Sequence, residues 1–172
     1  YGITSAMLSY PRAFVNYLDT LSGEIRPERI AMIGRNDVVG EDSATGWRNA
    51  IDQVDDMEIV VDERFEVGST DLAPVVRTVE GTDADVIAGN SYAQGSQLFT
   101  EAVANVGLSP DFLWFLLGPQ VPTWIDSLEA TGEYVFGSTP YAYSVPTDAN
   151  DELFDIAQER YGSLPHYSFG FG

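Results

Sequence analysis

The chain has 172 residues, the length of one domain, and carries 27 acidic against 8 basic residues, a formal net charge of −19 at pH 7. Binding to nucleic acid or to an anionic membrane surface is disfavoured, because both depend on Lys and Arg neutralising phosphate charges. The absence of cysteine excludes disulfides, thiolate catalysis and cysteine-ligated metal sites.

Predicted helices and strands alternate along the chain, beginning with a helix over residues 14–21 that is closed by Gly23. A strand over 29–34 follows, and the next helix has apolar residues at helical spacing over 47–54. The second strand, 58–65, is the most polar of the five predicted strands. We therefore expect it at an edge of the sheet.

The second half of the chain continues the same alternation. A helix over 72–79 has Asp71 as its expected N-cap and Pro74 in its first turn, where the missing N–H costs little. The two last helices are each expected to be closed by a glycine, Gly107 and Gly162. The remaining predicted elements are strands over 85–89, 111–117 and 134–138 and helices over 98–106 and 153–161.

The order of the elements predicts the fold class. Strands separated by single helices are typical of βαβ units, and strands that are apolar at consecutive positions are covered on both faces. We therefore expect an α/β fold of three layers, with helices on both sides of a mainly parallel, doubly wound, five-stranded sheet. In such a sheet, ligands bind beyond the carboxyl ends of the strands.

Four loops follow the carboxyl ends of predicted strands, and amide, phenol and carboxylate groups dominate them. Tyrosine offers a large face with a polar tip, which suits ligand recognition. Amides and carboxylates supply hydrogen bonds and charge. The candidate ligand-binding residues in these loops are Asn36, Asp37, Tyr92, Gln120 and Tyr141.

Motifs for catalysis or cofactor binding are poorly represented. G-x-G-x-x-G is missing after the first strand, and the phosphate-binding loop G-x-x-x-x-G-K-[ST] needs a lysine, which the chain lacks. The single histidine, His166, lies among the last seven residues, away from the loops where a Ser–His–Asp triad would need it. Asp37 is a nucleophile candidate, as in some phosphotransferases, or a residue of helix entry. We predict no catalytic residues, no cofactor and no metal site.

The order and spacing of several short segments, each of which occurs once, are informative together. The segments are Arg29-Ile-Ala-Met-Ile-Gly34 with Val39-Gly40-Glu41, Val67-Gly-Ser-Thr-Asp71-Leu, Asp83-Ala-Asp85-Val-Ile-Ala-Gly89, Gly95-Ser-Gln97-Leu, Val106-Gly107-Leu108, Gly118-Pro119 and Gly137. Together they resemble the second lobe of type I periplasmic solute-binding proteins of the branched-chain amino-acid family, and the resemblance covers nearly the whole chain.

This resemblance implies a protein of two α/β lobes that closes on a ligand by a hinge and then docks on an ABC-type permease. Residues 1–143 would form the ligand-binding second lobe, and 144–172 the hinge and the return towards a missing first lobe. The helix at 151–161 would then lack its native partner. The expected function is extracellular capture of a small polar ligand, an amino acid or a related amide or carboxylate. The alternative is a ligand-sensing domain of a receptor or regulator.

The residues carried over from the family match in part. In the family, the second lobe supplies aromatic residues and, for amino acids, a carboxylate for the ammonium group. Tyr92 matches a rim tyrosine, whereas Val39 and Gln120 stand where a tyrosine and an acidic residue are frequent. A glutamine cannot neutralise an ammonium group. Either Asp37 takes that role, or the ligand is an amide, a urea-like compound or a carboxylic acid.

The charge also predicts the medium in which the chain folds. All eight basic residues are arginine, and 44% of the residues are apolar, enough for a packed core. A core-forming chain with this self-repulsion needs a screening medium, and acidic surfaces are used by halophiles. We therefore expect an extreme halophile as its source and unfolding at low salt.

Overall fold

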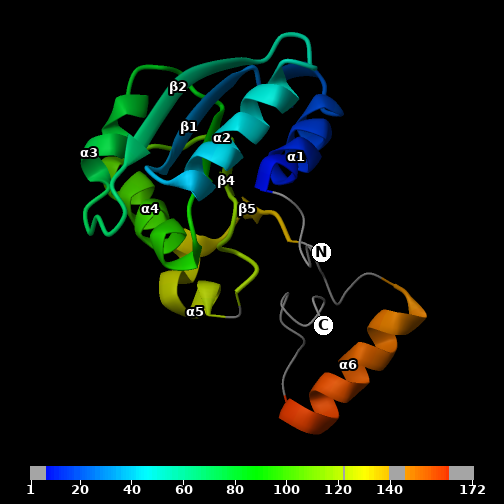
Figure 1. Ribbon diagram of the computed structural model, residues 1–172. Helices are drawn as coiled ribbons and strands as arrows, with labels where there is room; N and C mark the ends of the chain where they lie inside the picture. The colour runs from blue at the N-terminus through cyan, green and yellow to red at the C-terminus, as the bar shows by residue number, and fades with distance from the viewer. Residues whose placement is uncertain (1–6, 122, 140–145, 163–172) are drawn as a thin grey trace.

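The computed structural model describes residues 7–121, 123–139 and 146–162, and within them one sheet carries helices on both faces (Figure 1). The strands all pair in parallel, in the order β2-β1-β3-β4-β5. This confirms the predicted α/β class and places the polar second strand at an edge. The strands are β1 (Arg29–Arg35), β2 (Glu58–Phe65), β3 (Val86–Asn90), β4 (Phe112–Phe115) and β5 (Val135–Gly137).

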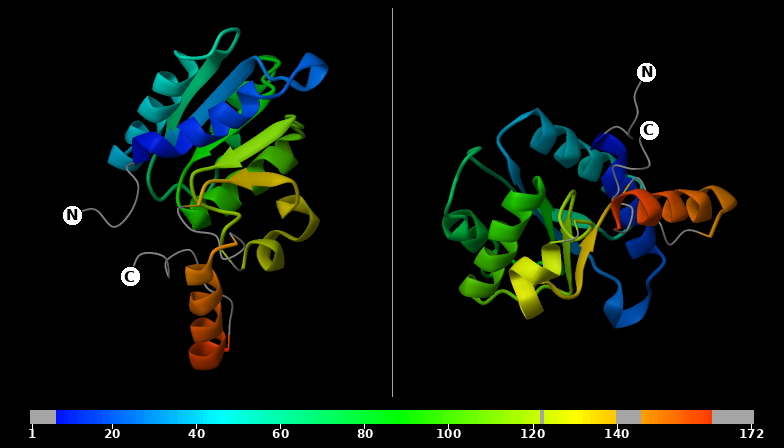
Figure 2. Two further views of the ribbon diagram at one scale, coloured as in Figure 1. Left: turned by 90° about the vertical axis from the view of Figure 1, so that its right-hand side faces the viewer. Right: turned by 90° about the horizontal axis from the view of Figure 1, so that it is seen from below.

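Helices cover the sheet in two layers. The helices are α1 (Tyr10–Asp19), α2 (Val38–Ile51), α3 (Ala73–Val76), α4 (Ala93–Val106), α5 (Trp124–Leu128) and α6 (Asp148–Tyr161), with short 3-10 helices at Met7–Ser9, Gly23–Ile25, Arg77–Val79 and Glu129–Gly132. α1 and α2 pack on one face, and α3, α4 and α5 pack on the other (Figure 2). α6 extends away from the sheet.

Alternation along each strand divides the core between the two faces. In β1, Ile30 and Met32 join the cluster under α1 and α2, whereas Ala31 and Ile33 join the cluster under α3, α4 and α5. All four are completely buried. The run of consecutive apolar residues predicted a strand covered on both faces, and the structure confirms it.

Several predicted boundaries need correction. α1 begins at Tyr10 and ends at Asp19, so Gly23 does not close it but opens the following 3-10 helix at φ +67°. The N-cap of α3 is Leu72, one residue later than predicted, although Asp71 Oδ1 accepts a hydrogen bond from the Ala73 N–H at 3.0 Å. A carboxylate that bonds the N–H two residues on forms an Asx turn rather than a cap.

Other helix ends are confirmed. Gly107 closes α4 and Gly162 closes α6, both in the left-handed region, at φ 83° and 63°. Glycine adopts this conformation without the penalty that a Cβ brings. The glycine itself therefore predicts where α4 and α6 end, whereas the end of α1 depends on how the chain turns towards β1.

α5 and the 3-10 helix after it were not predicted. Trp124 and Leu128 lie one helical turn apart and are both buried against the sheet. The indole Nε1 of Trp124 donates to the Gly132 carbonyl at 2.9 Å. A Cβ at Gly132 would lie 2.9 Å from this nitrogen, so the turn needs glycine there.

α6 is a well-capped helix with little packing. The Thr147 hydroxyl accepts from the Asn150 N–H at 3.3 Å at its start. Of its residues, only Ala157 is buried. The predicted domain boundary at 143/144 falls outside the described residues. No helix among the described residues is long and apolar enough to cross a membrane.

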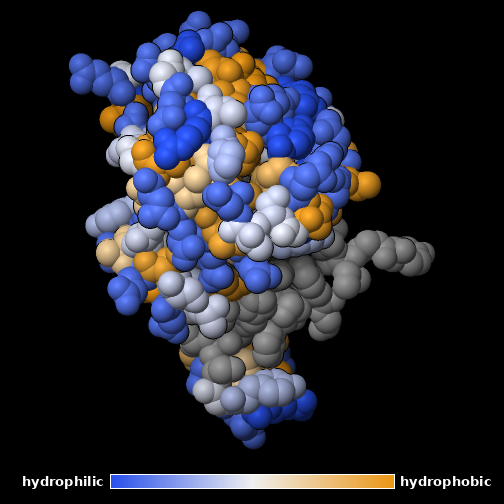
Figure 3. Space-filling view, turned by 90° about the vertical axis from the view of Figure 1, so that its left-hand side faces the viewer, coloured by the Kyte–Doolittle hydropathy of each residue, from blue (hydrophilic) through white to orange (hydrophobic). Residues whose placement is uncertain are grey.

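The surface follows the composition of the chain. Figure 3 looks onto the side of the molecule where α3 lies and shows mostly hydrophilic residues, with smaller apolar areas between them. Several exposed acidic residues stand at turns with positive φ, among them Asp56 at 64° and Asp83 at 52°. The net charge of −19 is thus carried at the surface around an apolar core.

Candidate ligand-binding site

The carboxyl ends of the parallel strands meet at one edge of the sheet, and the predicted site residues follow these ends. Asn36 and Asp37 follow β1, Tyr92 lies two residues after β3, and Gln120 lies in the loop after β4. Tyr141 lies outside the described residues. We call this edge the rim.

Asp37 begins α2 and is held from two sides. As the N-cap it accepts the Gly40 N–H at 3.0 Å through Oδ1, and Oδ2 forms an ion pair with the guanidinium of Arg35. Asp is among the best N-cap residues because it satisfies an orphan N–H and carries negative charge at the helix N-terminus. Both carboxylate oxygens are therefore engaged.

Arg35, the last residue of β1, is not among the predicted site residues, yet it connects two of them. Its side chain is 18% exposed and forms the ion pair with Asp37. Its Cζ lies 4.6 Å from the ring centroid of Tyr92, within the range of a cation–π contact. The sequence signal was available: an arginine that ends a buried strand at the carboxyl edge of the sheet.

Tyr92 is the N-cap residue of α4 and remains 42% exposed. One side of its ring is covered by the Arg35 guanidinium. Asp37 and Tyr92, which follow different strands, are thus brought together through Arg35. Exposed aromatic surface beside a fixed cation is suited to contact with a ligand that has both apolar and polar parts.

Asn36 and Gln120 form hydrogen bonds with other residues than Arg35, Asp37 and Tyr92. The Asn36 Nδ2 donates to Glu66 Oε1 at 2.8 Å, towards the end of β2. The half-buried Gln120 accepts from the Gly118 N–H at 2.8 Å and donates to the Ser138 carbonyl at 2.9 Å. The Gln120 amide therefore connects the loop after β4 to the end of β5.

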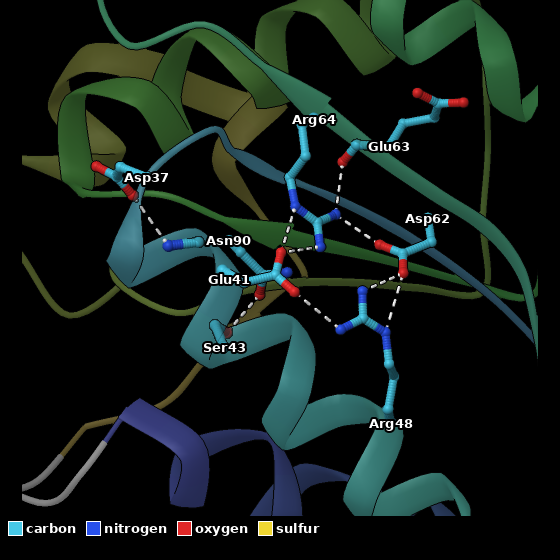
Figure 4. Close-up of polar contacts among 9 residues, drawn as sticks. Asp37, Glu41, Ser43, Arg48, Asp62, Glu63, Arg64 and Asn90 are labelled. Carbon is cyan, nitrogen blue, oxygen red and sulfur yellow. Dashed lines mark hydrogen bonds and ion pairs between the residues drawn. The ribbon is translucent and has the colours of Figure 1, made fainter.

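A buried polar pair supports the rim from below. The Ser43 hydroxyl of α2 donates to Asn90 Oδ1 at the end of β3, at 2.6 Å, and both residues are fully buried (Figure 4). Asn90 Nδ2 has no hydrogen-bond partner among the described residues. Gly34 permits this contact, because a Cβ there would lie 3.2 Å from the Asn90 Cβ. The pair fixes the start of α2 against β3.

A second polar cluster joins α2 to the edge strand β2 (Figure 4). Glu41 and Asp62 each contact both Arg48 and Arg64, which closes a cycle of four ion pairs that we call the α2–β2 ion ring. The distances are 3.1 Å for Arg48–Glu41, 2.8 Å for Arg64–Glu41 and 2.5 Å for Arg64–Asp62.

The α2–β2 ion ring keeps its members charged. Hydrogen bonds from Arg64 and Arg48 lower the pKa of Glu41. Burial alone would raise the pKa of Asp62, but hydrogen bonds from the same two arginines outweigh it, and the pKa is lowered. The ring joins α2 to β2 and thereby stabilises this edge of the sheet.

A known protein family matches the chain in sequence, and solved structures match its fold. The sequence profile of a family described as "Periplasmic binding protein" matches residues 5–171. Among curated proteins, no sequence matches the chain.

Solved structures match the fold over nearly the whole chain. One is a leucine-, isoleucine-, valine-, threonine- and alanine-binding protein from Brucella ovis in a closed conformation, with TM-score 0.80 and 18% identity, covering 98% of this chain and 42% of that one. A leucine-binding protein from Thermotoga maritima has TM-score 0.80, 14% identity and coverages of 98% and 48%. An extracellular ligand-binding receptor from Rhodopseudomonas palustris has TM-score 0.78, 16% identity and coverages of 96% and 48%. The chain thus spans less than half the length of each.

Proposed function

The chain belongs to the periplasmic binding protein family and has its type I fold, and from this premise we propose that it is the ligand-recognising second lobe of an extracellular solute-binding protein. It captures a small polar ligand, an amino acid or a related amide or carboxylate, for an ABC-type importer. The observation that carries the proposal is the arrangement of Asp37, Arg35 and Tyr92 at the carboxyl edge of the sheet. This is the edge at which open parallel sheets bind ligands.

The proposed ligand contacts come from residues on separate loops. Tyr92 offers its exposed ring, and Asp37 and Arg35 offer a fixed pair of opposite charges. Asn36, Gln120 and Tyr141 complete the proposed set. Gln120 also holds two of the loops together, so its substitution acts on the site through the backbone as well.

The mechanism is a shift of population between open and closed lobes, with contacts from both lobes stabilising the closed form. Residues 1–143 supply one wall of the site, and 144–172 supply the hinge and the return to the first lobe. The position of α6 supports this division, since it extends away from the sheet and buries only Ala157. A source among extreme halophiles is part of the same proposal.

An alternative is a ligand-sensing domain of a receptor or regulator, and the likeness to the extracellular ligand-binding receptor favours it. The same rim would serve both functions. A phosphotransferase that uses Asp37 is less well supported, because both oxygens of this carboxylate are engaged by the Gly40 N–H and by Arg35.

A thermal-shift screen of the chain in molar salt tests the proposed function. A ligand that binds only the folded state stabilises it by about 1.4 kcal/mol at a tenfold excess over Kd. We expect leucine, isobutyramide or 4-methylpentanoate at tens of millimolar to raise the midpoint. Y92A should lose this shift. Y134A, which removes an exposed tyrosine from the turn before β5, should keep it. No shift with any of these compounds would contradict the proposal.

A further inference from the structure

Hydrogen-bonding groups at the rim are unequally satisfied. Three acceptor oxygens are engaged: Asp37 receives the Gly40 N–H and the Arg35 guanidinium, and Gln120 Oε1 receives the Gly118 N–H. Arg35, in contrast, has donors to spare, because its Nε is buried without a partner among the described residues. The rim therefore has a surplus of hydrogen-bond donors at Arg35.

Arg35 is the source of this surplus. A guanidinium carries five N–H donors in a planar fork. Among the residues that the structure describes, only its Nη2 has an acceptor, on Asp37. Two other arginines, Arg48 and Arg64, each bond two carboxylates in the α2–β2 ion ring. Arg35 is thus a cation with donor capacity left, placed at the carboxyl end of a central strand.

The surroundings hold this guanidinium in place. Asp37 anchors one end of it, and the Tyr92 ring lies against its face at 4.6 Å. The side chain is 18% exposed, so a small part of it faces solvent at the rim while the rest is desolvated. A cation that is fixed and largely desolvated before the ligand arrives loses little freedom on binding.

We infer that Arg35 is a specificity-determining residue and that this lobe receives a carboxylate group of the ligand through it. The two oxygens of a carboxylate match the guanidinium fork, and such charge-assisted pairs are about twice as strong as neutral hydrogen bonds. The exposed part of the Tyr92 ring is then available to the apolar portion of the ligand. This inference rests on the proposed function, of which it names the ligand class.

An ammonium group fits the same place poorly. It brings three donors and no acceptor, so it would have to share the Asp37 oxygens with the Gly40 N–H and the Arg35 guanidinium. It also carries the same sign of charge as Arg35. Asp37 therefore acts as a positioning residue for the arginine, and the ligand-contacting charge at the rim is positive.

Titration of the isotopically labelled 172-residue chain, followed by NMR, tests the assignment. The probes are 4-methylpentanoate and 3-methylbutylamine, which keep the side chain of leucine and, respectively, only its carboxylate or only its ammonium. In molar salt the screening length is about 3 Å, so the long-range field of the acidic chain contributes little. We expect 4-methylpentanoate to shift the Arg35 Nε–Hε resonance and the Tyr92 amide, and the amine to leave both unchanged.

Two variants sharpen the test. R35Q should weaken 4-methylpentanoate binding by about tenfold or more, since it removes a charge-assisted contact. R77Q removes an arginine of the 3-10 helix Arg77–Val79 that pairs with Glu80 and makes no contact with Asp37 or Tyr92, and it should bind as the original chain does. If R35Q does not fold, the shift of the Arg35 resonance in the original chain still decides.

Different failures have different meanings. Binding of the amine and not of the acid would overturn the inference and leave the proposed function in place. Binding of the acid with equal strength to R35Q would overturn it as well. If neither probe nor leucine moves any resonance of residues 35–37 or 91–93, both the inference and the proposed function are contradicted.

Discussion

Asp37 has two interactions that substitution can separate. D37A removes both the cap and the ion pair with Arg35, whereas D37N keeps a good capping side chain and loses only the charge. We expect D37A to lower the free energy of unfolding by about 1 kcal/mol more than D37N does. Urea unfolding of both variants measures the difference.

The same pair of variants bears on the ligand. In D37N the Arg35 guanidinium loses the carboxylate that positions it, so 4-methylpentanoate should bind more weakly than to the original chain. Equal or tighter binding by D37N would show that Asp37 does not position Arg35. Equal destabilisation by the two substitutions would show that Asp37 does not cap α2.

At the residue scale, the sequence predicts where the site residues lie better than it predicts which residues they contact. Asp37 and Tyr92 follow strand ends, and the rule that parallel sheets bind ligands at this edge is enough to select them. Arg35 was passed over although the predicted strand ended at Gly34 and so placed it first in the loop; the structure extends β1 by one residue to include it. The contacts of Gln120 required knowing that β5 lies beside β4, since its partner Ser138 is 18 residues away.

At the element scale, the α2–β2 ion ring joins a helix to an exposed sheet edge. Unpaired strand edges invite pairing with other chains, and charged side chains on them prevent it. Isolated surface ion pairs contribute about 0–1 kcal/mol, but here each carboxylate is shared by two arginines, and Asp62 is 29% exposed. The ring thus stabilises the docking of β2 against α2.

The stability of the ring depends on pH in a direction that the pKa shifts fix. Because the pKa values of Glu41 and Asp62 are lowered on folding, their contribution is complete above the unfolded values, about 4, and is lost as the pH falls through the lower folded values. We expect an E41Q/D62N variant to lose about 1 kcal/mol at neutral pH and progressively less in acid. Urea unfolding over a series of pH values measures this convergence.

A matched control uses two exposed carboxyls outside the ring. E101Q/D52N removes one Glu and one Asp, as the ring variant does, from positions on or beside helices. It should run parallel to the original chain across the same pH series. Equal curves for both double variants would mean that the ring contributes nothing to stability.

The spacing of apolar residues predicted which segments are helical, but it did not predict where several of the helices begin. α2 begins at Val38, well before the apolar stripe that predicts it, because its first turns carry glycine and polar residues whose anchors are the Asp37 cap and the buried Ser43–Asn90 pair. α5 is too short to show a period, and its stability depends on burying Trp124. Both cases depend on tertiary contacts that local propensity does not contain.

At the scale of the whole molecule, the layer architecture was predictable because burial on both faces makes β1 and β3 apolar at consecutive positions. The parallel order followed from the single helices between strands. The strand order itself, and the placement of α6 away from the sheet, were not encoded in any periodic pattern. They depend on which surfaces remain to be covered, and for α6 the proposed first lobe is that surface.

The net charge of −19 predicts that the stability of the chain depends on salt, and this effect involves the entire surface. Repulsion among the acidic residues opposes folding, and added salt shortens its range from about 10 Å at 0.1 M to about 3 Å at 1 M. The α2–β2 ion ring is weakened by the same screening, but it involves only four charges. We therefore expect the urea midpoint to rise steeply with sodium chloride up to about 1 M.

A D56N/D83N variant supplies the control, since both residues are exposed at positive φ, which Asn tolerates. It should be more stable than the original chain at low salt and equal to it at high salt, because it removes two of the repelling charges without strain. A midpoint that is unchanged between low and molar salt would contradict the prediction that the surface is adapted to salt. It would mean that burial of the apolar core outweighs the charge repulsion without screening by salt.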